Sequence, residues 1–416
     1  MQSLLILGRQ PELGIAELES LYGADKIKVI SSNVVLLDVD PCLLAFDRLG
    51  GSIKFAKVLT KLETTNWREI EDFIIKVSPD QTLKMPAGKM TLGLSLYGFN
   101  QSAKNIINTG IKIKREIQKT DRSVRLVPNQ ASELNSAQVI HNKLTRPNGW
   151  ELLFIKSYGV TYVAQTVKVQ DIKSYSLRDR NRPYRDSRIG MLPPKLAQII
   201  INLASGLLPE ELRLSVCDIP EDEIIPITDQ EKTILDPFCG TGVILQEALL
   251  MGYKVIGSDI DPRMIDYSKK NLDWLTIKIK RLNQTKNYSK DNIFVGDAIN
   301  TKWPKFDFIA SETFLGKPMS SSFTNEQIAH EINICNTTIK SFLKNLLNNL
   351  DKDSRLCLAV PAWQVSRNQF KHLSLIDQLD DLGYNQLSFK SINTKELIYI
   401  RPDQIVARQL LVLKRK

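Results

Sequence analysis

The sequence predicts an α/β protein whose C-terminal part is a Rossmann-like domain built on a mostly parallel sheet. Residues 233–235 form a short apolar run with strand character, a glycine turn follows at 236–242, and residues 243–250 have a helical pattern. Three later strand-like runs, at 255–259, 293–297 and 306–312, each end in an acidic residue. Ligands of open α/β sheets bind outside the carboxyl ends of the strands, so these acids mark one candidate site.

The sequence of the N-terminal part, residues 1–170, predicts two smaller α/β units. In residues 1–62 we expect a strand at 3–7, a helix at 12–21 and a strand at 33–39, after which residues 46–51 lead into 52–59. In residues 63–170 we expect helices at 67–77, 103–120 and 135–144, strands at 89–97 and 124–126, and a hairpin of 151–158 and 161–169 around Gly159.

The order of elements in residues 63–170 resembles a THUMP domain, an RNA-binding module of several tRNA-modifying enzymes. Such modules usually follow a ferredoxin-like unit, which the resemblance places at residues 1–62. The segments L-G-R-Q-P-E-L at 7–13 and L-G-G-S-I-K at 49–54 also look like the N-terminal unit of the archaeal and eukaryotic tRNA guanine-10 N2-methyltransferases. The resemblance therefore implies that residues 1–170 hold RNA.

Residues 171–190 predict a basic linker without a packed element, because they contain five arginines, two tyrosines and a proline. Arginine suits bidentate phosphate contacts and stacking on bases. A solvated linker with local Arg–Asp pairs explains the same composition equally well. The sequence leaves both interpretations open.

Residues 191–416 predict the catalytic domain. Its elements begin with a proline-initiated helix at 191–204 and, after the fourth strand, continue with a helix at 325–350, a strand at 356–360 and a helix at 364–382. A hairpin of 392–400 and 404–413 across Arg401-Pro402-Asp403 completes the domain.

The glycine turn is the strongest motif of the chain. It reads D-P-F-C-G-T-G over residues 236–242, and glycines let a ligand approach the backbone closely. Asp259 lies 23 residues beyond Asp236, a spacing at which a carboxylate accepts hydrogen bonds from ribose hydroxyls. The third glycine of a nicotinamide-binding fingerprint is absent, which argues against a dinucleotide enzyme.

This turn resembles the S-adenosylmethionine site of class I methyltransferases, especially those that carry D-P-P-Y after the fourth strand and methylate exocyclic amines. The resemblance implies a seven-stranded sheet of order 3-2-1-4-5-7-6 and S-adenosyl-L-methionine as cofactor. It places the methionine end at the turn, the ribose at Asp259 with Ile260, and the adenine amine at Asp297 with Ala298. The turn residues implied are Asp236, Pro237, Phe238, Gly240, Thr241 and Gly242.

The segment after the fourth strand reads S-E-T-F-L-G over residues 311–316. An exocyclic amine is a poor nucleophile, and acceptors that favour its tetrahedral transition state help it to react. The resemblance gives the acceptor role to Glu312 with the adjacent Ser311, and stacking on the base to Phe314. The double proline of the family is missing here, and the aromatic residue comes one position early.

The basic excess of the chain lies in one block. Residues 101–190 contain 17 Lys or Arg against 7 Asp or Glu, a net charge equal to the +10 of the whole chain. A localised basic surface is expected for a protein that binds a phosphate backbone, although a solvated basic face is the alternative. The candidate RNA-binding residues are Lys112, Lys114, Arg115, Arg122, Arg125, Arg178, Arg180, Arg182 and Arg185.

The composition, 43% hydrophobic and 25% charged in 416 residues, is typical of a soluble protein with more than one domain. No apolar run approaches the roughly 20 residues of a membrane span, so no membrane partner is expected. Five scattered cysteines and three histidines predict neither a metal site nor a disulfide framework, which fits a cytoplasmic protein. We expect no catalytic role for Cys239 or for the three histidines.

Three functions remain open at this point. The first is methylation of RNA, with N2 of a guanosine in tRNA as target. The second is an amino-methyltransferase of DNA or ribosomal RNA, which would share the catalytic domain. The third is an RNA-binding protein whose methyltransferase domain is a degenerate scaffold, because fold alone does not establish function.

Overall fold

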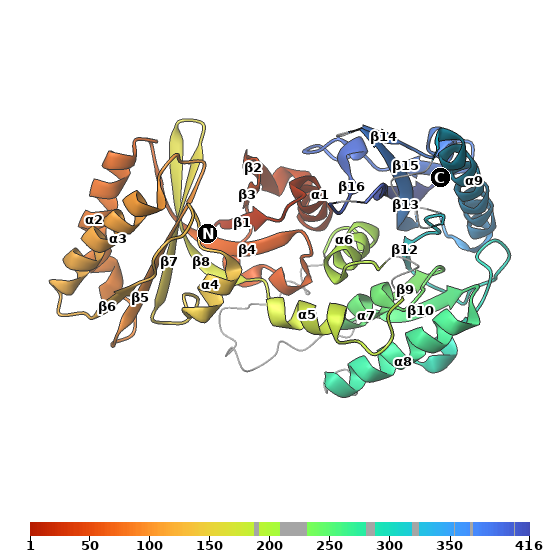
Figure 1. Cartoon of the computed structure of the whole chain (residues 1–416), viewed down its shortest axis with the longest axis horizontal. Coiled ribbons are helices and arrows are strands. Elements are labelled where there is room, and N and C mark those ends of the chain that lie inside the picture. The colour runs from red at the N-terminus through yellow and green to blue at the C-terminus, as the bar shows by residue number, and fades with distance from the viewer. Residues whose placement is uncertain are drawn as a thin grey trace.

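The computed structural model describes residues 1–186, 191–208, 231–279, 288–317, 324–352, 354–366, 369–402 and 404–416. Figure 1 shows two sheets, one in each half of the molecule, with helix α6 (Pro194–Ser205) between them.

The N-terminal half is built on one sheet of eight strands in the order β2-β3-β1-β4-β8-β7-β5-β6. Because β4 pairs antiparallel with both β1 and β8, the two units predicted for residues 1–170 share a continuous sheet. The strands are β1 (Ser3–Leu7), β2 (Ile27–Ser31), β3 (Val34–Leu37), β4 (Ser52–Leu62), β5 (Met90–Tyr97), β6 (Val124–Leu126), β7 (Gly149–Ser157) and β8 (Val160–Val169). The sequence did not predict β2.

A buried ion pair ties the strands of this sheet together. Lys54 of β4 lies 2.5 Å from Glu151 of β7, and both side chains are almost fully buried. Ser95 of β5 and Thr166 of β8 donate to the same carboxylate, each at 2.6 Å. The carboxylate on β7 therefore has partners on three other strands, as a buried charge requires.

Three of the helices predicted for the N-terminal half form close to their expected positions: α1 (Pro11–Tyr22), α2 (Trp67–Leu83) and α3 (Ala103–Gln118). Helix α3 begins after Ser102, whose side chain accepts from the N–H of Asn105. Its buried residues include Ile106, Ile113 and Ile117, which lie on one face. The opposite face carries the lysines and arginine predicted from the charge block. The shorter helix α4 (Ser136–His141) lies inside the predicted 135–144 segment.

The connector is more ordered than the sequence predicted. Residues 172–180 form helix α5 (Ile172–Arg180), which begins after Asp171 because the Asp171 carboxylate accepts from the N–H of Ser174 at 3.0 Å. The prediction that this segment has no packed element was therefore wrong. Residues 187–190 of the predicted linker lie outside the described residues.

The C-terminal sheet has the predicted order. Its main path is β11-β10-β9-β12-β13-β17-β15, which is 3-2-1-4-5-7-6 when the strands are numbered along the chain. The two remaining strands, β14 and β16, pair with β13 and β17. The strands are β9 (Thr233–Asp236), β10 (Lys254–Asp259), β11 (Ile293–Val295), β12 (Phe308–Glu312), β13 (Arg355–Ser366), β14 (Gln369–Lys371), β15 (Tyr384–Gln386), β16 (Ile398–Tyr399) and β17 (Val406–Arg415).

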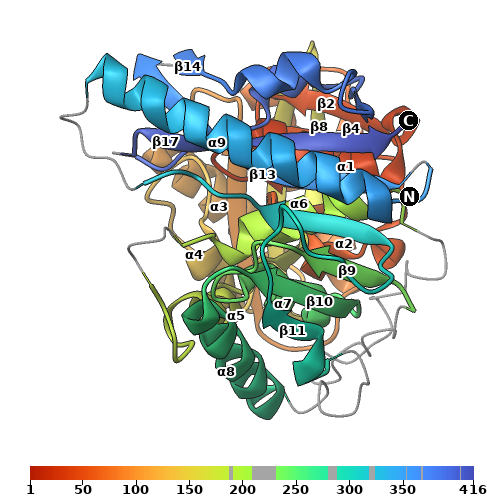
Figure 2. The ribbon, with the colours of Figure 1, turned by 90° about the vertical axis from the view of Figure 1, so that its right-hand side faces the viewer.

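The helices cover both faces of this sheet. Helices α6 and α7 (Val243–Leu250) pack on one face together with α1 and α8 (Pro262–Lys278), and α9 (Asn325–Leu346) packs on the other. Figure 2 shows α9 in front of the sheet, with α6 and α1 behind it.

The helix predicted for residues 364–382 is wrong. Strand β13 continues to Ser366, and β14 pairs back on it antiparallel through Trp363 and Lys371. Only a short 3-10 segment follows, at Ser374–Gln378. The nine residues of β13 through Trp363 pair with β17, and the residues that follow pair with β14 instead of forming the expected helix.

Helix α6 joins the two halves through buried polar contacts. Its Asn202 donates to Glu17 of α1 at 2.7 Å and accepts from Arg48 at 3.0 Å. Glu17 also accepts from the N–H groups of Gly50 and Gly51, and burial raises its pKa to about 7. These contacts fix the N-terminal half on the C-terminal sheet.

Among the described residues, no helix is long and apolar enough to cross a membrane, and no group of three or more candidate metal ligands occurs. Cys42 is disulfide-bonded, which the sequence did not predict. Cys239, Cys335 and Cys357 are free and buried.

Candidate active site

Four acids meet at one edge of the C-terminal sheet. Asp236, Asp259 and Glu312 are the last residues of β9, β10 and β12, and Asp297 follows two residues after β11. Because β10, β9 and β12 are parallel neighbours, and β11 is parallel to β10, their carboxyl ends lie on the same side. The structure thus brings together the acids that the sequence placed at strand ends.

The glycine turn leaves an open approach to its backbone. Gly240 and Gly242 have φ values of +49° and +83°, a region that side chains rarely adopt. A Cβ on Gly242 would lie 2.5 Å from the hydroxyl of Ser268, whereas one on Gly240 would meet no atom within 4 Å. Helix α7 begins directly after the turn, so its first N–H groups lack partners within the helix and are ready to bind an anionic group.

Asp236, at the start of this turn, is held by two hydrogen bonds. Its Oδ1 accepts from the hydroxyl of Ser311 at 2.6 Å and from the N–H of Phe238 at 3.2 Å. Burial raises the pKa of Asp236 to about 8. Ser311 is fully buried and is held by this hydrogen bond. The hydroxyl of Ser311, predicted to share the acceptor role with Glu312, is thus directed to Asp236.

Asp259 links the glycine turn to the second strand. Its Oδ2 accepts from the N–H of Gly240 and its Oδ1 from the N–H of Asp261, each at 2.9 Å. Burial raises its pKa, but the side chain is only half-buried. Each oxygen of a carboxylate has two lone pairs, so both retain capacity for a hydroxyl donor.

The segment beside Asp259 offers apolar surface. Ile260 is 68% exposed, and Ile299 is 42% exposed. The N–H of Gly296 donates to the backbone oxygen of Asp259 at 3.0 Å, which holds the segment of Asp297 against the end of β10. Asp297 accepts from the N–H of Ile299 at 3.1 Å. Exposed isoleucines that follow Asp259 and Asp297 in the chain provide apolar surface for a flat, partly apolar group.

The remaining residues predicted to bind the cofactor are buried or half-buried. Ala298 and Pro237 are buried, and Phe238 packs edge-on against Phe342 of α9. Thr241 is half-buried, and its backbone oxygen accepts from Asn271. Their side chains therefore pack within the protein rather than project into solvent.

Glu312 has a partner that the sequence did not predict. Its Oε1 lies 2.6 Å from Nε of Arg408 on β17. The Glu312 side chain is 16% exposed, and two residues later Phe314 is 39% exposed. An acceptor and an accessible aromatic ring therefore stand together at the end of β12. Arg408 could have been suspected from the sequence, because it is the one charged residue among the mostly apolar residues 406–413 of this strand.

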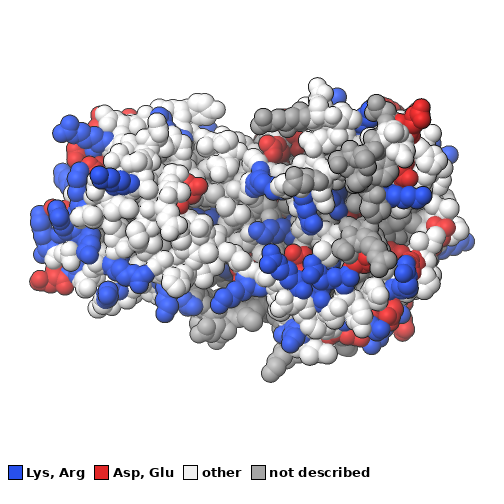
Figure 3. Space-filling model, in the orientation of Figure 1, with Lys and Arg blue, Asp and Glu red and all other residues white. Residues whose placement is uncertain are grey.

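The basic residues fall into two groups. Lys112, Arg115, Arg125, Arg180 and Arg185 are exposed, and Lys114 is half-buried. Lys112 pairs with Glu71 at 2.8 Å. Figure 3 shows Lys and Arg side chains along the lower edge of the N-terminal sheet and again on the lower part of the C-terminal half.

Two of the predicted RNA-binding arginines, Arg178 and Arg182, are buried, and a third, Arg122, is half-buried. Arg178 is buried against Glu247 of α7, with Nε 2.7 Å from the carboxylate. Arg122 donates to the backbone oxygens of Thr82 and Pro86. Arg182 is buried, and burial lowers its pKa to about 10. The count of charged residues in a sequence does not show which arginines are buried and which are exposed.

The strand order, the glycine turn and the strand-end acids define a class I methyltransferase fold. A family model described as "DNA methylase" (N6_N4_Mtase) matches residues 216–270. A curated tRNA (guanine(10)-N2)-dimethyltransferase of Methanothermobacter thermautotrophicus is 29% identical over 175 residues, which are 42% of this chain and 40% of that protein.

A protein of the same name from Methanocaldococcus jannaschii is 34% identical over 155 residues, which are 34% of this chain and 36% of that protein. The matches thus span less than half the length of these relatives. The predicted resemblance to the tRNA guanine-10 N2-methyltransferases is confirmed. Among solved structures, TrmN from Thermus thermophilus covers the whole of both chains at 14% identity, with a TM-score of 0.49.

Proposed function

We propose that this chain transfers the methyl group of S-adenosyl-L-methionine to an exocyclic amine of RNA, with N2 of a guanosine in tRNA as the target. The observation that carries the proposal is the shared edge of the C-terminal sheet, where the glycine turn, Asp259 and Asp297 lie beside Glu312 and Phe314. The names of the curated relatives support tRNA as the substrate.

The residues at this edge fit the proposed cofactor. The open backbone at Gly240 and the first N–H groups of α7 suit its anionic methionine carboxylate. The carboxylate of Asp259 suits two ribose hydroxyls, Asp297 suits the adenine amine, and Ile260 suits the face of the purine. When bound, the cofactor supplies an electrophilic methyl group on a sulfonium.

Glu312 and Phe314 act on the acceptor base in this proposal. The target base leaves its stack, and the exposed ring of Phe314 receives it. The second carboxylate oxygen of Glu312, which does not bind Arg408, accepts from one amine N–H as the nitrogen becomes tetrahedral and positively charged. The new bond joins the amine nitrogen to the methyl carbon, the carbon–sulfur bond breaks, and the amine then loses one proton.

Residues 1–170 bind the RNA in this proposal, as a THUMP-like module beside a ferredoxin-like unit. The support is the basic charge of residues 101–190 and the exposure of Lys112, Arg115 and Arg125. Residues 191–416 carry out the transfer. A cytoplasmic location is part of the proposal and suits a tRNA substrate.

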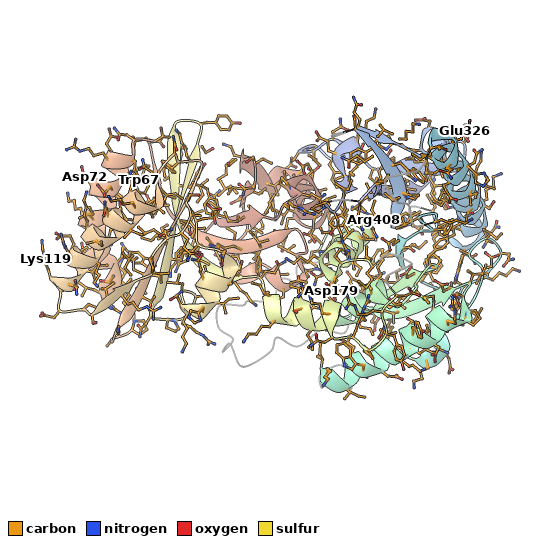
Figure 4. All side chains as sticks on the ribbon, viewed as in Figure 1. Trp67, Asp72, Lys119, Asp179, Glu326 and Arg408 are labelled. Atoms are coloured by element: carbon orange, nitrogen blue, oxygen red, sulfur yellow. The ribbon has the colours of Figure 1, made fainter. Side chains whose placement is uncertain are left out.

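The test is single-turnover transfer of labelled methyl from S-adenosylmethionine to unmodified tRNA. Glu312→Gln keeps an acceptor oxygen but loses the negative charge, so we expect a loss of about 100-fold in rate with near-normal cofactor and tRNA binding. Glu326→Gln is the control, because Glu326 is an exposed acid on α9, well separated from Arg408 in Figure 4. Wild-type rates in Glu312→Gln would remove Glu312 from the mechanism.

A DNA amino-methyltransferase is the second candidate, because the matching family model is described as a DNA methylase. That match covers only 216–270, which include the glycine turn and β10 but none of the acceptor-side residues. The same assay with duplex DNA and with ribosomal RNA separates the candidates. No transfer by the wild type to any nucleic acid would favour a degenerate scaffold.

A further inference from the structure

Arg408 reaches Glu312 across β13 at a point where that strand carries two small side chains, Ala359 and Pro361. Glu312 of β12 is opposite Ala359 of β13, and Arg408 of β17 is opposite Pro361 two residues further along β13. Alternate residues of a strand share a face, so all four lie on the same face of the sheet. Ala359 and Pro361 leave room above them for the arginine side chain to pass.

The contact is directed and enclosed. Nε of Arg408 donates to Oε1 of Glu312 at 2.6 Å, and its Nη1 donates to Oε1 of Gln404 at 3.4 Å. The Arg408 side chain is 3% exposed, against 16% for Glu312. Figure 4 shows Arg408 on the side of the C-terminal sheet that faces α6. The guanidinium is therefore the inner member of the pair, and the carboxylate is the outer one.

We infer that Arg408 is a positioning residue for methyl transfer, which holds one oxygen of Glu312 so that the other faces the acceptor amine. This role rests on the proposed function. A glutamate at the end of a strand has three rotatable side-chain bonds, and the pair with Arg408 restricts them before the substrate arrives. Small misplacements of a reacting group lower rates strongly, so orientation of this carboxylate raises the rate rather than the affinity.

The pair also gives the site a defined charge. With both side chains ionised, Glu312 and Arg408 together are neutral, although the negative end lies closer to solvent. A neutral base with an N–H donor fits such a site better than a phosphate, which the outer carboxylate would repel. The geometry thus assigns the pair to the acceptor base rather than to the RNA backbone.

The experiment compares single-turnover methyl transfer to tRNA by Arg408→Met, Arg408→Lys, Glu312→Gln and the double variant Glu312→Gln/Arg408→Met. We expect Arg408→Met to lose about 10- to 100-fold in rate while apparent affinities for S-adenosylmethionine and tRNA change less than about twofold. Arg408→Lys keeps a donor and should recover part of the loss. In the Glu312→Gln background, Arg408→Met should cost little more, because the two residues act as one unit.

Arg415→Met is the matched control, since Arg415 lies at the other end of β17. Thermal unfolding and calorimetric binding of S-adenosylmethionine show that each variant is folded at the assay temperature. Equal losses from Arg408→Met in both backgrounds, or wild-type rates in a folded Arg408→Met, would overturn the positioning role alone. Absence of transfer by the wild type would overturn the proposed function and this role with it.

Discussion

Replacement of Asp259 by Ala tests the proposed cofactor site most directly. In the structure its carboxylate already accepts from the N–H groups of Gly240 and Asp261, and each oxygen keeps capacity for a ribose hydroxyl. Hydrogen bonds to a charged group contribute about 1.5–3 kcal/mol. We therefore expect the dissociation constant of S-adenosylmethionine to rise about 10- to 150-fold, since about 1.4 kcal/mol corresponds to a factor of ten.

Isothermal titration calorimetry measures this change, and two further variants separate its causes. Asp259→Asn keeps one acceptor oxygen, so its loss should be intermediate. Asp291→Ala removes an exposed acid just before β11 and should leave the affinity unchanged. Thermal unfolding reports the separate cost of leaving the N–H of Gly240 without its acceptor. An Asp259→Ala variant that is folded and binds S-adenosylmethionine with wild-type affinity would refute the assignment of Asp259 to the ribose.

Two arginines of α5 should behave differently although they are two residues apart. Arg180→Gln, on the surface, should weaken tRNA binding and reduce its salt dependence by about one phosphate contact, measured by filter binding at several salt concentrations. Arg178→Met should instead lower the free energy of unfolding by about 3–5 kcal/mol, because it leaves Glu247 buried without its partner; an unchanged melting temperature would contradict this. Burial raises the pKa of Asp236 from its ordinary value to about 8, so its contribution to stability is present at low pH and is lost as the pH rises toward 8. Asp236→Asn should therefore flatten the fall in melting temperature between about pH 5 and about pH 8.5, and an unchanged slope would show that Asp236 does not titrate in this range.

The catalytic half was the easier part to predict, because its signals are local. A strand, a glycine turn and a helix are adjacent in the chain, and a run of apolar residues that ends in an acid needs no distant contact to be recognised. The order 3-2-1-4-5-7-6 followed from the resemblance and is confirmed. The acids Asp236, Asp259 and Glu312 reach one edge because parallel strands have their carboxyl ends on the same side.

Pairing between distant segments decided what the sequence did not. Strand β13 pairs over Arg355–Trp363 with β17, more than 40 residues later along the chain, and its continuation to Ser366, paired with β14, takes the place of the helix expected at 364–382. The two N-terminal units share one sheet, because β4 pairs with β8, which lies about 100 residues further along the chain. Local propensity is weaker than such tertiary pairing, so elements whose partners are distant are the hardest to predict.

The sequence by itself determined that this chain has a glycine turn with strand-end acids and a strongly basic block before them. Only the tertiary structure decided which charges are available for function. Arg178 and Arg182 are turned inward and Ser311 is held by Asp236, while Arg408 of β17 reaches Glu312. The physical reason is that the role of a charged side chain depends on its burial and its partner, and both depend on contacts between residues that are remote in sequence.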